Sequence, residues 1–330
     1  MWITSSPATA LTPTAIALGN FDGVHRGHRR VIEPVLVPVT ESQRSLLAQK
    51  GRSPLATGSE LPQIYTTVVT FWPHPREFFS GQPRALLTPI AEKAQQLKVM
   101  GVDQLVRLPF DRELASLTPQ DFVDVILVRQ LGATRVSVGQ DFRFGHGRTG
   151  TAEHLRAIAA HHGIEVIIVP LETCAEERIS SSGIREALQS GDIARANRLL
   201  GHPYTLLGDV VAGAQLGRKL GFPTANLRLP SDKFLPRQGV YSAWAYLAHD
   251  PAPLPAVMNL GNRPTVDGLN QTVEVHLLDW SGDLYGQTLT VCLESFLRPE
   301  QKFDSLESLT AQIHLDCEQA KASLSAKVQA

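Results

Sequence analysis

The first half of the chain alternates apolar, β-branched runs with segments whose apolar residues recur at helical spacing. The apolar runs predict strands at 14–19, 65–72, 104–108, 135–139 and 165–170, the last of them buried because of its Val-Ile-Ile-Val run. Helical spacing, hydroxyl caps and terminal glycines predict helices at 27–37, 89–100, 118–132 and 151–162. Strands that alternate with helices favour a doubly wound α/β domain, in which helices cover both faces of a parallel sheet.

The pattern changes after two short helical stretches at 183–189 and 193–200. Five β-rich runs then follow without an intervening helix, at 204–211, 240–248, 256–261, 272–279 and 289–296. Such strands are antiparallel and predict a small barrel or sandwich, followed by a terminal helix at 305–324. We therefore predict two domains, residues 1–186 and residues 187–330.

One segment interrupts the alternation of strands and helices. Residues 40–64 are rich in Ser, Gln, Gly and Pro and show no hydrophobic period. A structureless loop of this length is unusual inside a compact domain. We interpret the segment as a mobile insertion between the first helix and the second strand, either a plain solvated loop or a functional lid.

Composition narrows the class of protein. The 330 residues are 43% hydrophobic, which excludes disorder of the whole chain, and 31 basic residues balance 32 acidic ones. No global positive field therefore indicates nucleic acid or an anionic membrane as a partner. Cys174, Cys292 and Cys317 are too few and too scattered for a disulfide framework or a zinc site. Without a signal peptide or a membrane-spanning run, we expect a cytoplasmic protein, whose oligomeric state stays open, a weak homo-oligomer included.

The strongest local signal is the stretch Gly19–His28, GNFDGVHRGH, between the first predicted strand and the first predicted helix. Ligands of open parallel sheets bind at the carboxyl ends of strands, and the glycines allow the backbone to approach a ligand closely. His25 and His28 are three residues apart, so both face one way on an opening helical turn. Two imidazoles and a helix N-terminus form an anion site suited to a triphosphate. The alternative is a pair of structural histidines.

This stretch, together with residues 70–75, 138–145 and 179–185, resembles the HxGH nucleotidylyltransferase superfamily and, more closely, bacterial FAD synthetase. The resemblance implies that His25 and His28 contact the phosphates while ATP adenylylates FMN. It implies an ATP site made of Gly19, Phe21, Asp22, Gly23, Gly27, Arg178, Ser181 and Arg185. It also implies a flavin-side group made of Pro73, His74 and Asp141.

Two features do not fit this resemblance directly. The family usually has an acidic residue where this chain has Trp72, so the role of that acid does not transfer. Residues 145–150, GHGRTG, satisfy the GxGxxG pattern of dinucleotide-binding dehydrogenases, and Glu172 lies downstream. The first glycine of a true fingerprint ends a strand directly, whereas residues 140–144 intervene here. We therefore expect no dinucleotide site at this position.

A second glycine-rich stretch, residues 213–226, follows a predicted strand. Three glycines with Arg218 and Lys219 form a flexible, cationic phosphate loop, although a basic surface hairpin is the alternative. Thr224 and Asn226 are two residues apart, so in an extended chain both face the same side and can bind a phosphate-bridging Mg²⁺ through oxygen. The string GFPTAN resembles riboflavin kinase. The resemblance implies an ATP site made of Gly213, Gly217, Arg218, Lys219, Gly221 and Pro223.

The predicted strand at 272–279 alternates, so that Glu274 and His276 face away from its valines. Glu274 is either an exposed strand residue or, as the kinase resemblance implies, the general base that accepts a proton from the alcohol of riboflavin. The same resemblance implies a flavin site that includes Arg298 and Phe303.

Together, the resemblances cover roughly residues 14–325, except the insertion. They imply an HxGH-type α/β domain followed by a small antiparallel β-barrel with a terminal helix. They also imply two ATP- and Mg²⁺-dependent activities, with riboflavin, FMN and ATP as the small-molecule substrates. Two alternatives stay open: another HxGH transferase with a different phosphorylated acceptor, and a flavin-binding regulatory protein that no longer turns over.

Overall fold

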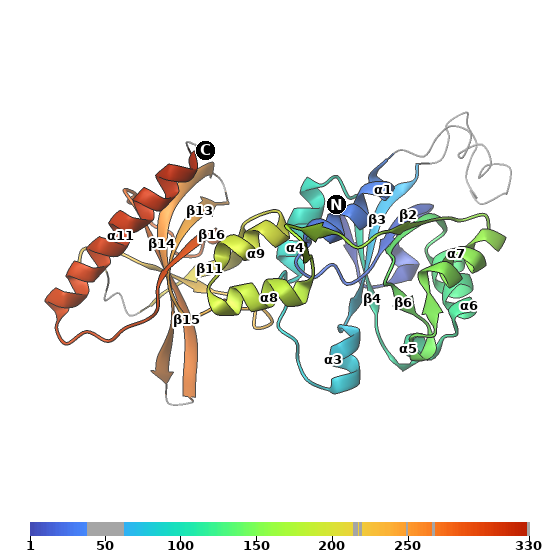
Figure 1. Cartoon of the computed structure of the whole chain (residues 1–330), viewed down its shortest axis with the longest axis horizontal. Coiled ribbons are helices and arrows are strands. Elements are labelled where there is room, and N and C mark those ends of the chain that lie inside the picture. Colours follow the sequence, from blue (N-terminus) through green and yellow to red (C-terminus); the bar gives the residue numbers. More distant parts are fainter. Residues whose placement is uncertain (38–62, 214–216, 218–219, 249, 266–267, 329–330) are drawn as a thin grey trace. The chain divides into compact units, whose positions relative to one another are not determined.

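The structure is a computed structural model that describes residues 1–37, 63–213, 217, 220–248, 250–265 and 268–328. The chain forms two compact units (Figure 1): the first contains residues 1–84 and 93–179, and the second contains residues 85–92 and 180–330. The second unit therefore includes a short segment that the sequence places far upstream. The predicted domain boundary between residues 186 and 187 falls inside one helix, Ser181–Ser190, and it stays a prediction.

The first unit is built on a parallel sheet. Its strands and helices are β1 (Trp2–Thr4), η1 (Pro7–Thr9), β2 (Thr14–Leu18), α1 (Arg26–Leu36), β3 (Tyr65–Trp72), α3 (Pro75–Ser80), β4 (Gln104–Pro109), α5 (Arg112–Ser116), α6 (Pro119–Asp121), η2 (Phe122–Gln130), β5 (Ala133–Gly139), β6 (Arg143–Phe144), η3 (His146–Arg148), β7 (Gly150–Thr151), α7 (Ala152–His161), β8 (Glu165–Val169), β9 (Thr173–Cys174) and β10 (Glu177–Arg178). Helix α4 (Ile90–Val99) begins in the second unit and continues in the first.

The order of strands in the sheet is β1-β4-β3-β2-β5-β8, and all neighbours are parallel. From β2 the chain moves outward to β3 and β4, and later returns to place β5 and β8 on the opposite side of β2. Every residue of β2 is buried, as expected for a central strand that is covered on both faces. On one face, Ile16 and Leu18 share a core with Leu127 and Leu155. This architecture confirms the predicted doubly wound α/β fold.

The prediction that residues 165–170 form a buried strand was wrong in one respect. They form β8, but β8 is the edge of the sheet, and its apolar residues are only partly buried. A strand at an edge has a neighbour on one side only, so apolar composition alone does not bury it. The predicted helix at 118–132 begins as expected, with the Thr118 hydroxyl accepting a hydrogen bond from the N–H of Asp121.

The second unit is a closed antiparallel barrel with helices attached. Its elements are α8 (Ser181–Ser190), α9 (Ile193–Leu200), β11 (Tyr204–Val211), β12 (Ala225–Arg228), β13 (Gly239–Leu247), β14 (Asp250–Thr265), β15 (Gly268–Leu277), β16 (Thr288–Arg298) and α11 (Leu306–Val328). The barrel order is β11-β12-β15-β14-β13-β16, and β16 pairs with β11 to close it. The predicted barrel and terminal helix are confirmed.

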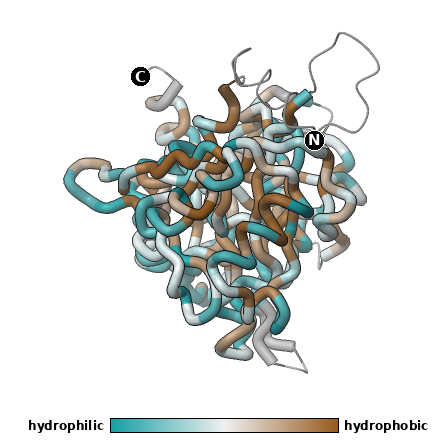
Figure 2. The backbone as a smooth tube through the Cα atoms, turned by 90° about the vertical axis from the view of Figure 1, so that its right-hand side faces the viewer, coloured by the Kyte–Doolittle hydropathy of each residue, from teal (hydrophilic) through white to brown (hydrophobic). Residues whose placement is uncertain are grey.

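Hydrophobic stretches of the backbone, brown in Figure 2, gather toward the inside of the fold, and hydrophilic stretches, teal, toward its outside. Helix α11 packs on the barrel, where its Cys317 and Ala320 join a core with Phe222, Val240 and Val257. All three cysteines are free thiols. None of the helices in the described ranges combines the length and the apolar character that a membrane span requires. The predicted insertion at 40–64 lies outside the described residues, except for positions 63 and 64.

Candidate functional site

The stretch Gly19–His28 leaves the carboxyl end of β2 and enters α1. Strands β2 and β5 are the neighbours from which the chain departs in opposite directions, so this end of the sheet is a topological switch point, where such folds bind ligands. Phe21 (φ 49°) and Val24 (φ 41°) have left-handed backbone conformations. Bulky and β-branched residues rarely adopt that conformation, and such strain tends to collect at functional sites.

The two histidines of the stretch form a close pair. His25 is the N-cap of α1, and its Nδ1 accepts a hydrogen bond from the backbone N–H of His28 at 3.2 Å. The two rings stack with their centroids 3.5 Å apart. Burial, followed by the charges of His25 and Lys93, holds the pKa of His28 well below its usual range, so the ring is neutral at pH 7.

Two polar atoms in this stretch are buried without a hydrogen-bond partner in the described part of the chain. They are Nδ1 of His28 and Oδ1 of Asn20. A buried polar group without a partner costs about 1–3 kcal/mol, and native proteins usually satisfy such groups with protein, water or ligand. The pair of atoms therefore indicates a site for a polar ligand at the start of α1.

The other residues predicted for this site lie near the ends of neighbouring strands. His74 follows β3 and caps α3, where its Nδ1 accepts a hydrogen bond from the N–H of Arg76 at 3.1 Å. Burial, followed by the charge of Arg84, lowers the pKa of His74 to about 4. Asp141 follows β5 and forms an ion pair with Arg178 at 2.7 Å. Because β3, β2 and β5 are consecutive parallel strands, these groups lie near one another at the carboxyl ends of the strands.

The three serines Ser180–Ser182 lie at the start of helix α8, and the first of them caps it. The Ser180 hydroxyl accepts a hydrogen bond from the N–H of Gly183 at 3.2 Å, and Ser181 is the first residue of α8. Arg185 donates a hydrogen bond to the carbonyl of Ala85 at 2.7 Å and lies over the ring of Phe234. Ser181 and Arg185 belong to the second unit and Arg178 to the first, so a joint role for them in binding ATP stays a prediction.

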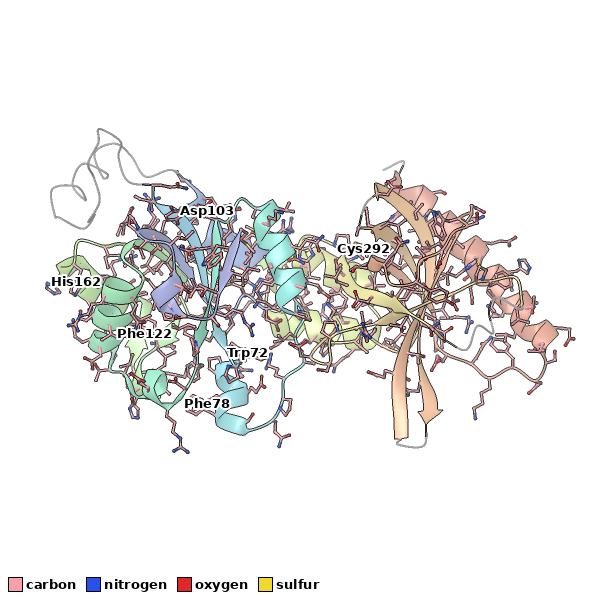
Figure 3. The ribbon with its side chains drawn as sticks, turned by 180° about the vertical axis from the view of Figure 1, so that it is seen from behind. Trp72, Phe78, Asp103, Phe122, His162 and Cys292 are labelled. Carbon is pink, nitrogen blue, oxygen red and sulfur yellow. The ribbon has the colours of Figure 1, made fainter. Side chains whose placement is uncertain are left out.

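An aromatic cluster at this end of the sheet was not predicted from the sequence. The rings of Phe71, Phe78 and Phe79 each contact Phe110 edge to face. Trp72 ends β3, with the guanidinium of Arg107 over its ring at 4.7 Å. Figure 3 labels Trp72 and, on α3, Phe78. Phe79 is 71% exposed and Trp72 43% exposed, unusual values for such large apolar side chains. The signal that could have revealed the cluster is the Phe78-Phe79 pair, which begins three residues after Pro75 at the end of the PHP string.

In the second unit, Glu274 lies on the outer face of the barrel wall. Val273, Val275 and Leu277 of β15 are buried inside the barrel, whereas Glu274 and His276 are only partly buried, as the alternation predicts. Glu274 lies opposite Asn226 of β12 and, on its other side, opposite Asn259 of β14. Directly opposed residues share a face with Cβ atoms about 4.5–5.5 Å apart. The barrel therefore places a carboxylate between two amide side chains.

Three of the residues predicted to bind phosphate or metal lie beside Glu274: Gly213, Thr224 and Asn226. The Thr224 hydroxyl donates a hydrogen bond to Oε2 of Glu274 at 3.3 Å. The backbone of Gly213 approaches Asn226 so closely that a Cβ at position 213 would lie 2.2 Å from Nδ2 of Asn226. A side chain at 213 would therefore displace the Asn226 amide, and the glycine-rich loop starts directly against this group. Arg218 and Lys219 lie outside the described residues.

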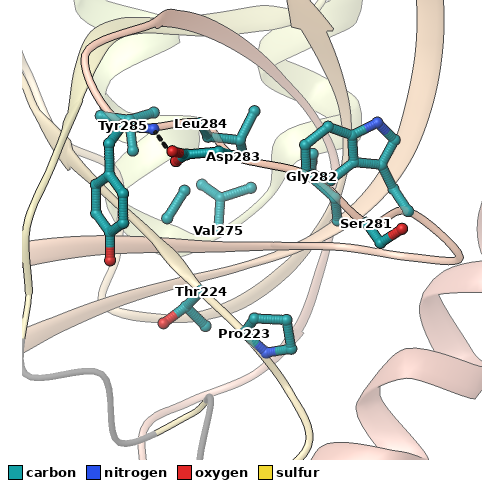
Figure 4. A pocket seen from close by; sticks show the side chains of 12 residues that line it. Pro223, Thr224, Val275, Ser281, Gly282, Asp283, Leu284 and Tyr285 are labelled. Carbon is teal, nitrogen blue, oxygen red and sulfur yellow. Dashed lines mark hydrogen bonds between the residues drawn. The ribbon is translucent and has the colours of Figure 1, made fainter.

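A pocket with a volume of about 630 Å³ opens next to Thr224. Pro223 and Thr224 form one side of it, and the segment from Asp283 to Tyr285 forms the other (Figure 4). The remaining lining comes from Val210, Ala225, Val275, Leu277, Trp280, Ser281 and Gly282. Its lining is a mixture of apolar and polar surface with two aromatic residues, which suits a small organic molecule that carries polar groups. None of the residues of 280–285 was predicted as a site residue.

Arg298 and Phe303 lie at the end of β16 and after it. Arg298 forms two parallel hydrogen bonds with the carboxylate of Asp316 on α11, both at 2.8 Å, and its guanidinium lies 5.7 Å from the centre of the Phe303 ring. Such a bidentate pair fixes the arginine in orientation. The structure thus brings Arg298 and Phe303 together, and their contact with a flavin stays a prediction.

Comparison with known proteins shows which family this chain resembles. The FAD synthetase family model matches residues 8–48 and 55–183, and the riboflavin kinase family model matches residues 200–324. A bifunctional riboflavin kinase/FMN adenylyltransferase from Escherichia coli K12 is 40% identical, over 91% of this chain and 90% of its own length. The chain belongs to the bifunctional riboflavin kinase/FMN adenylyltransferase family. Another member, from Pseudomonas fluorescens, is 38% identical over 92% of this chain and 91% of its own length.

A solved structure also resembles this chain along nearly its whole length. A crystal structure described as a macrolide-efflux protein from Streptococcus pneumoniae superimposes with a TM-score of 0.78 and 30% identity, over 97% of this chain and 98% of that one.

The GHGRTG string lies in and between the short antiparallel strands β6 and β7. It forms no strand-to-helix turn, so the dehydrogenase pattern has no structural counterpart in this bifunctional enzyme.

Proposed function

We propose that the chain converts riboflavin to FMN in its second unit and FMN to FAD in its first, with ATP as co-substrate in both steps. The observation that carries this proposal is that each segment matched by a family model holds its own group of polar residues in a phosphate-binding setting. In the first unit this is the histidine pair at the switch point of the sheet. In the second it is the row of Asn226 and Glu274 beside the glycine-rich loop.

In the kinase step, Glu274 accepts the proton of the 5′-hydroxyl of riboflavin. The hydroxyl oxygen forms a bond to the γ-phosphorus of ATP, while the bond from that phosphorus to the β–γ bridging oxygen breaks and ADP leaves. Glu274 suits the role of base because the barrel wall holds it between amides and beside the Thr224 hydroxyl. General bases of this kind contribute about 10²–10⁴-fold to rate.

The residues present fit Mg²⁺ as the metal of this site. Mg²⁺ prefers oxygen ligands and is usually held by one or two protein groups together with substrate phosphates. Thr224 and Asn226 offer a hydroxyl and an amide oxygen beside the Glu274 carboxylate. No cluster of three or more His, Cys, Asp or Glu side chains forms a metal site within the described part of the chain. When bound, Mg²⁺ would neutralise charge on the phosphates of ATP.

The 630 Å³ pocket suits the nucleoside of the ATP that phosphorylates riboflavin. It adjoins Thr224, so a nucleoside held there could extend its phosphates toward Glu274. Trp280 and Tyr285 line the pocket and offer faces or edges to an adenine ring.

In the adenylyltransferase step, an oxygen of the FMN phosphate attacks the α-phosphorus of ATP. The bond from that phosphorus to the α–β bridging oxygen breaks, and pyrophosphate leaves. No nucleophile of the protein is needed, so the protein contributes position and charge neutralisation. His25, His28 and the N-terminus of α1 face the phosphates, and Arg178 contributes positive charge on the pyrophosphate side.

The flavin ring of FMN suits the aromatic cluster beside His74. Phe79 and Trp72 expose large aromatic surface at the end of the sheet where ligands bind. Offset stacking or edge contact with an aromatic ring contributes about 0.5–1.5 kcal/mol beyond the burial of area.

The experiment that tests the proposal separates the two steps by substrate. The purified chain is incubated with Mg-ATP and either riboflavin or FMN, and the flavins are separated by chromatography. We expect riboflavin to give FMN and then FAD, and FMN to give FAD with release of pyrophosphate. FAD formation without any phosphorylation of riboflavin would remove the kinase half of the proposal. No product from either flavin would indicate an HxGH transferase with a different phosphorylated acceptor, and flavin binding without turnover would indicate a regulatory protein; each of these results would overturn the proposal.

A further inference from the structure

Lys93 is a buried lysine directly beneath the Gly19–His28 stretch. Its side chain extends from α4, and the residue is only 6% exposed. Its ammonium donates a hydrogen bond to the backbone carbonyl of Asn20 at 2.8 Å. The same carbonyl accepts a second hydrogen bond from the Thr70 hydroxyl at 3.0 Å. The carbonyl of Asn20, the second residue of the stretch, therefore accepts hydrogen bonds from side chains of two other elements, α4 and β3.

A buried ammonium is costly, which makes a purely space-filling role for Lys93 a poor explanation. Removing a charged group from water costs several kcal/mol unless opposite charge and hydrogen bonds compensate. The charged and titratable groups that face it are Asp22 on the loop, Arg107 on β4, His28 on α1 and His74 before α3. A methionine or leucine would fill the same volume without that cost.

The backbone that Lys93 holds has conformations that need external support. Between Asn20 and the start of α1, the chain passes through the left-handed residues Phe21 and Val24 and through Gly23 (φ 99°). For residues other than glycine, such as Phe21 and Val24, this conformation costs about 1–3 kcal/mol each and persists only when surrounding contacts enforce it. Asn20 follows the end of β2 at Leu18 by two residues and directly precedes Phe21, so fixing its carbonyl fixes the entry into the strained turn.

We propose that Lys93 is a positioning residue for adenylyl transfer, which holds the strained turn so that His25 and His28 face the phosphates of ATP. This inference rests on the proposed adenylyltransferase function of the first unit. Because a shift of about 1 Å in a catalytic group can cost about 100-fold in rate, loss of this hold lowers turnover more than it lowers binding of either substrate.

The charge of Lys93 supplies a readout that a structural role would not change. Burial, opposed by Asp22 and assisted by Arg107, lowers the pKa of Lys93 to about 8. As the pH rises through 8, the side chain loses its positive charge, and the hydrogen bond to Asn20 loses its charge assistance. Turnover for FAD formation should therefore fall on the alkaline side with a midpoint near pH 8.

The test compares Lys93→Met and Lys93→Arg with Lys98→Met, an exposed lysine on the same helix, as the matched control. We expect Lys93→Met to lower kcat for FAD formation about 10–100-fold. In Lys93→Met, we expect the KM for ATP and the kinase activity to stay near wild type. In Lys98→Met, we expect kcat for FAD formation and its dependence on pH to stay near wild type. The alkaline limb near pH 8 should be absent in Lys93→Met and move above pH 10 in Lys93→Arg.

Thr70→Val keeps the test decisive if Lys93→Met does not fold. It removes the other donor to the same carbonyl, so kcat should fall several-fold while the alkaline limb stays near pH 8. If the wild type forms FAD, two results would overturn the role of Lys93. One is a normal kcat with an unchanged alkaline limb in Lys93→Met, and the other is a normal kcat in Thr70→Val. A wild type that forms no FAD would overturn the proposed function and this inference with it.

Discussion

The second unit contains a buried ion pair whose removal should destabilise it strongly. Lys233 and Glu92 have side chains that are 1% and 3% exposed, and Nζ of Lys233 lies 2.5 Å from Oε2 of Glu92. The same ammonium donates to the carbonyls of Leu87 at 2.7 Å and Thr205 at 2.6 Å, and it lies over the ring of Tyr204. Glu92 also accepts a hydrogen bond from the N–H of Leu207. The pair thus joins residues 85–92 to the start of β11.

The expected magnitude follows from what each substitution leaves behind. Glu92→Leu removes the carboxylate that lies against the buried ammonium of Lys233, and breaking a buried pair in this way costs about 3–5 kcal/mol. For a unit of this size, each kcal/mol lowers the melting temperature by about 2–4 °C, so we expect a decrease of roughly 6–20 °C. In the double variant Glu92→Leu/Lys233→Met no uncompensated charge is left, so it should regain at least half of that loss. The three backbone groups that lose partners keep it below wild type.

The assay is differential scanning calorimetry of the full chain, with loss of kinase activity on heating as the marker for the second unit. The matched control is Lys321→Met, which removes an exposed ion pair of the same unit with Asp279. Exposed pairs are worth about 0–1 kcal/mol, so the control should move the transition little. If Glu92→Leu costs less than about 1 kcal/mol, or if the double variant is as unstable as the sum of both single variants, the ion pair does not hold the segment.

Four further predictions concern the two sites and their separation. Glu274→Gln should lower kinase turnover by about 10²–10⁴-fold while riboflavin binding, followed by fluorescence quenching, and adenylylation of supplied FMN stay near normal; unchanged turnover would exclude the role of base. His28→Ala should lower FAD formation by about 10²–10³-fold while FMN accumulates, and equal loss of both activities in a folded variant would argue against separate sites. Because the pKa of His28 is held low in the free protein and an adjacent phosphate raises it, ATP binding at this site should take up protons and tighten as the pH falls. Calorimetry in buffers of different ionisation enthalpy measures that uptake, and its absence would place His28 away from phosphate. Finally, a fragment that starts near residue 187 should still phosphorylate riboflavin but melt below the second unit of the full chain, because it lacks Glu92.

Local sequence determined the elements and the glycine-rich loops. The strands β2, β3 and β11 lie within one residue of their predicted bounds, because apolar period and turn residues act over a few positions. The capping of α1 and α8 by His25 and Ser180 also follows from side chains close in sequence. The resemblance to two families, and hence the function, rested on such local strings.

Tertiary structure decided what depends on pairing between distant residues. The position of β8 at the edge and the closure of β16 on β11 follow from which strands meet, and period alone does not encode that choice. The four-residue β12 is too short to leave a periodic signal, and it becomes a strand because β11 and β15 offer it backbone partners. The same pairing sets Asn226 beside Glu274.

Buried charge was the other property that sequence alone did not reveal. Glu92 and Lys93 are adjacent residues of α4, whose many polar residues predict an exposed face, and both are buried in the fold. Charged side chains are usually exposed, so the sequence favours solvent for both. Only the folded chain supplies Lys233 for Glu92 and the carbonyl of Asn20 for Lys93, and these partners make burial of the charges tolerable.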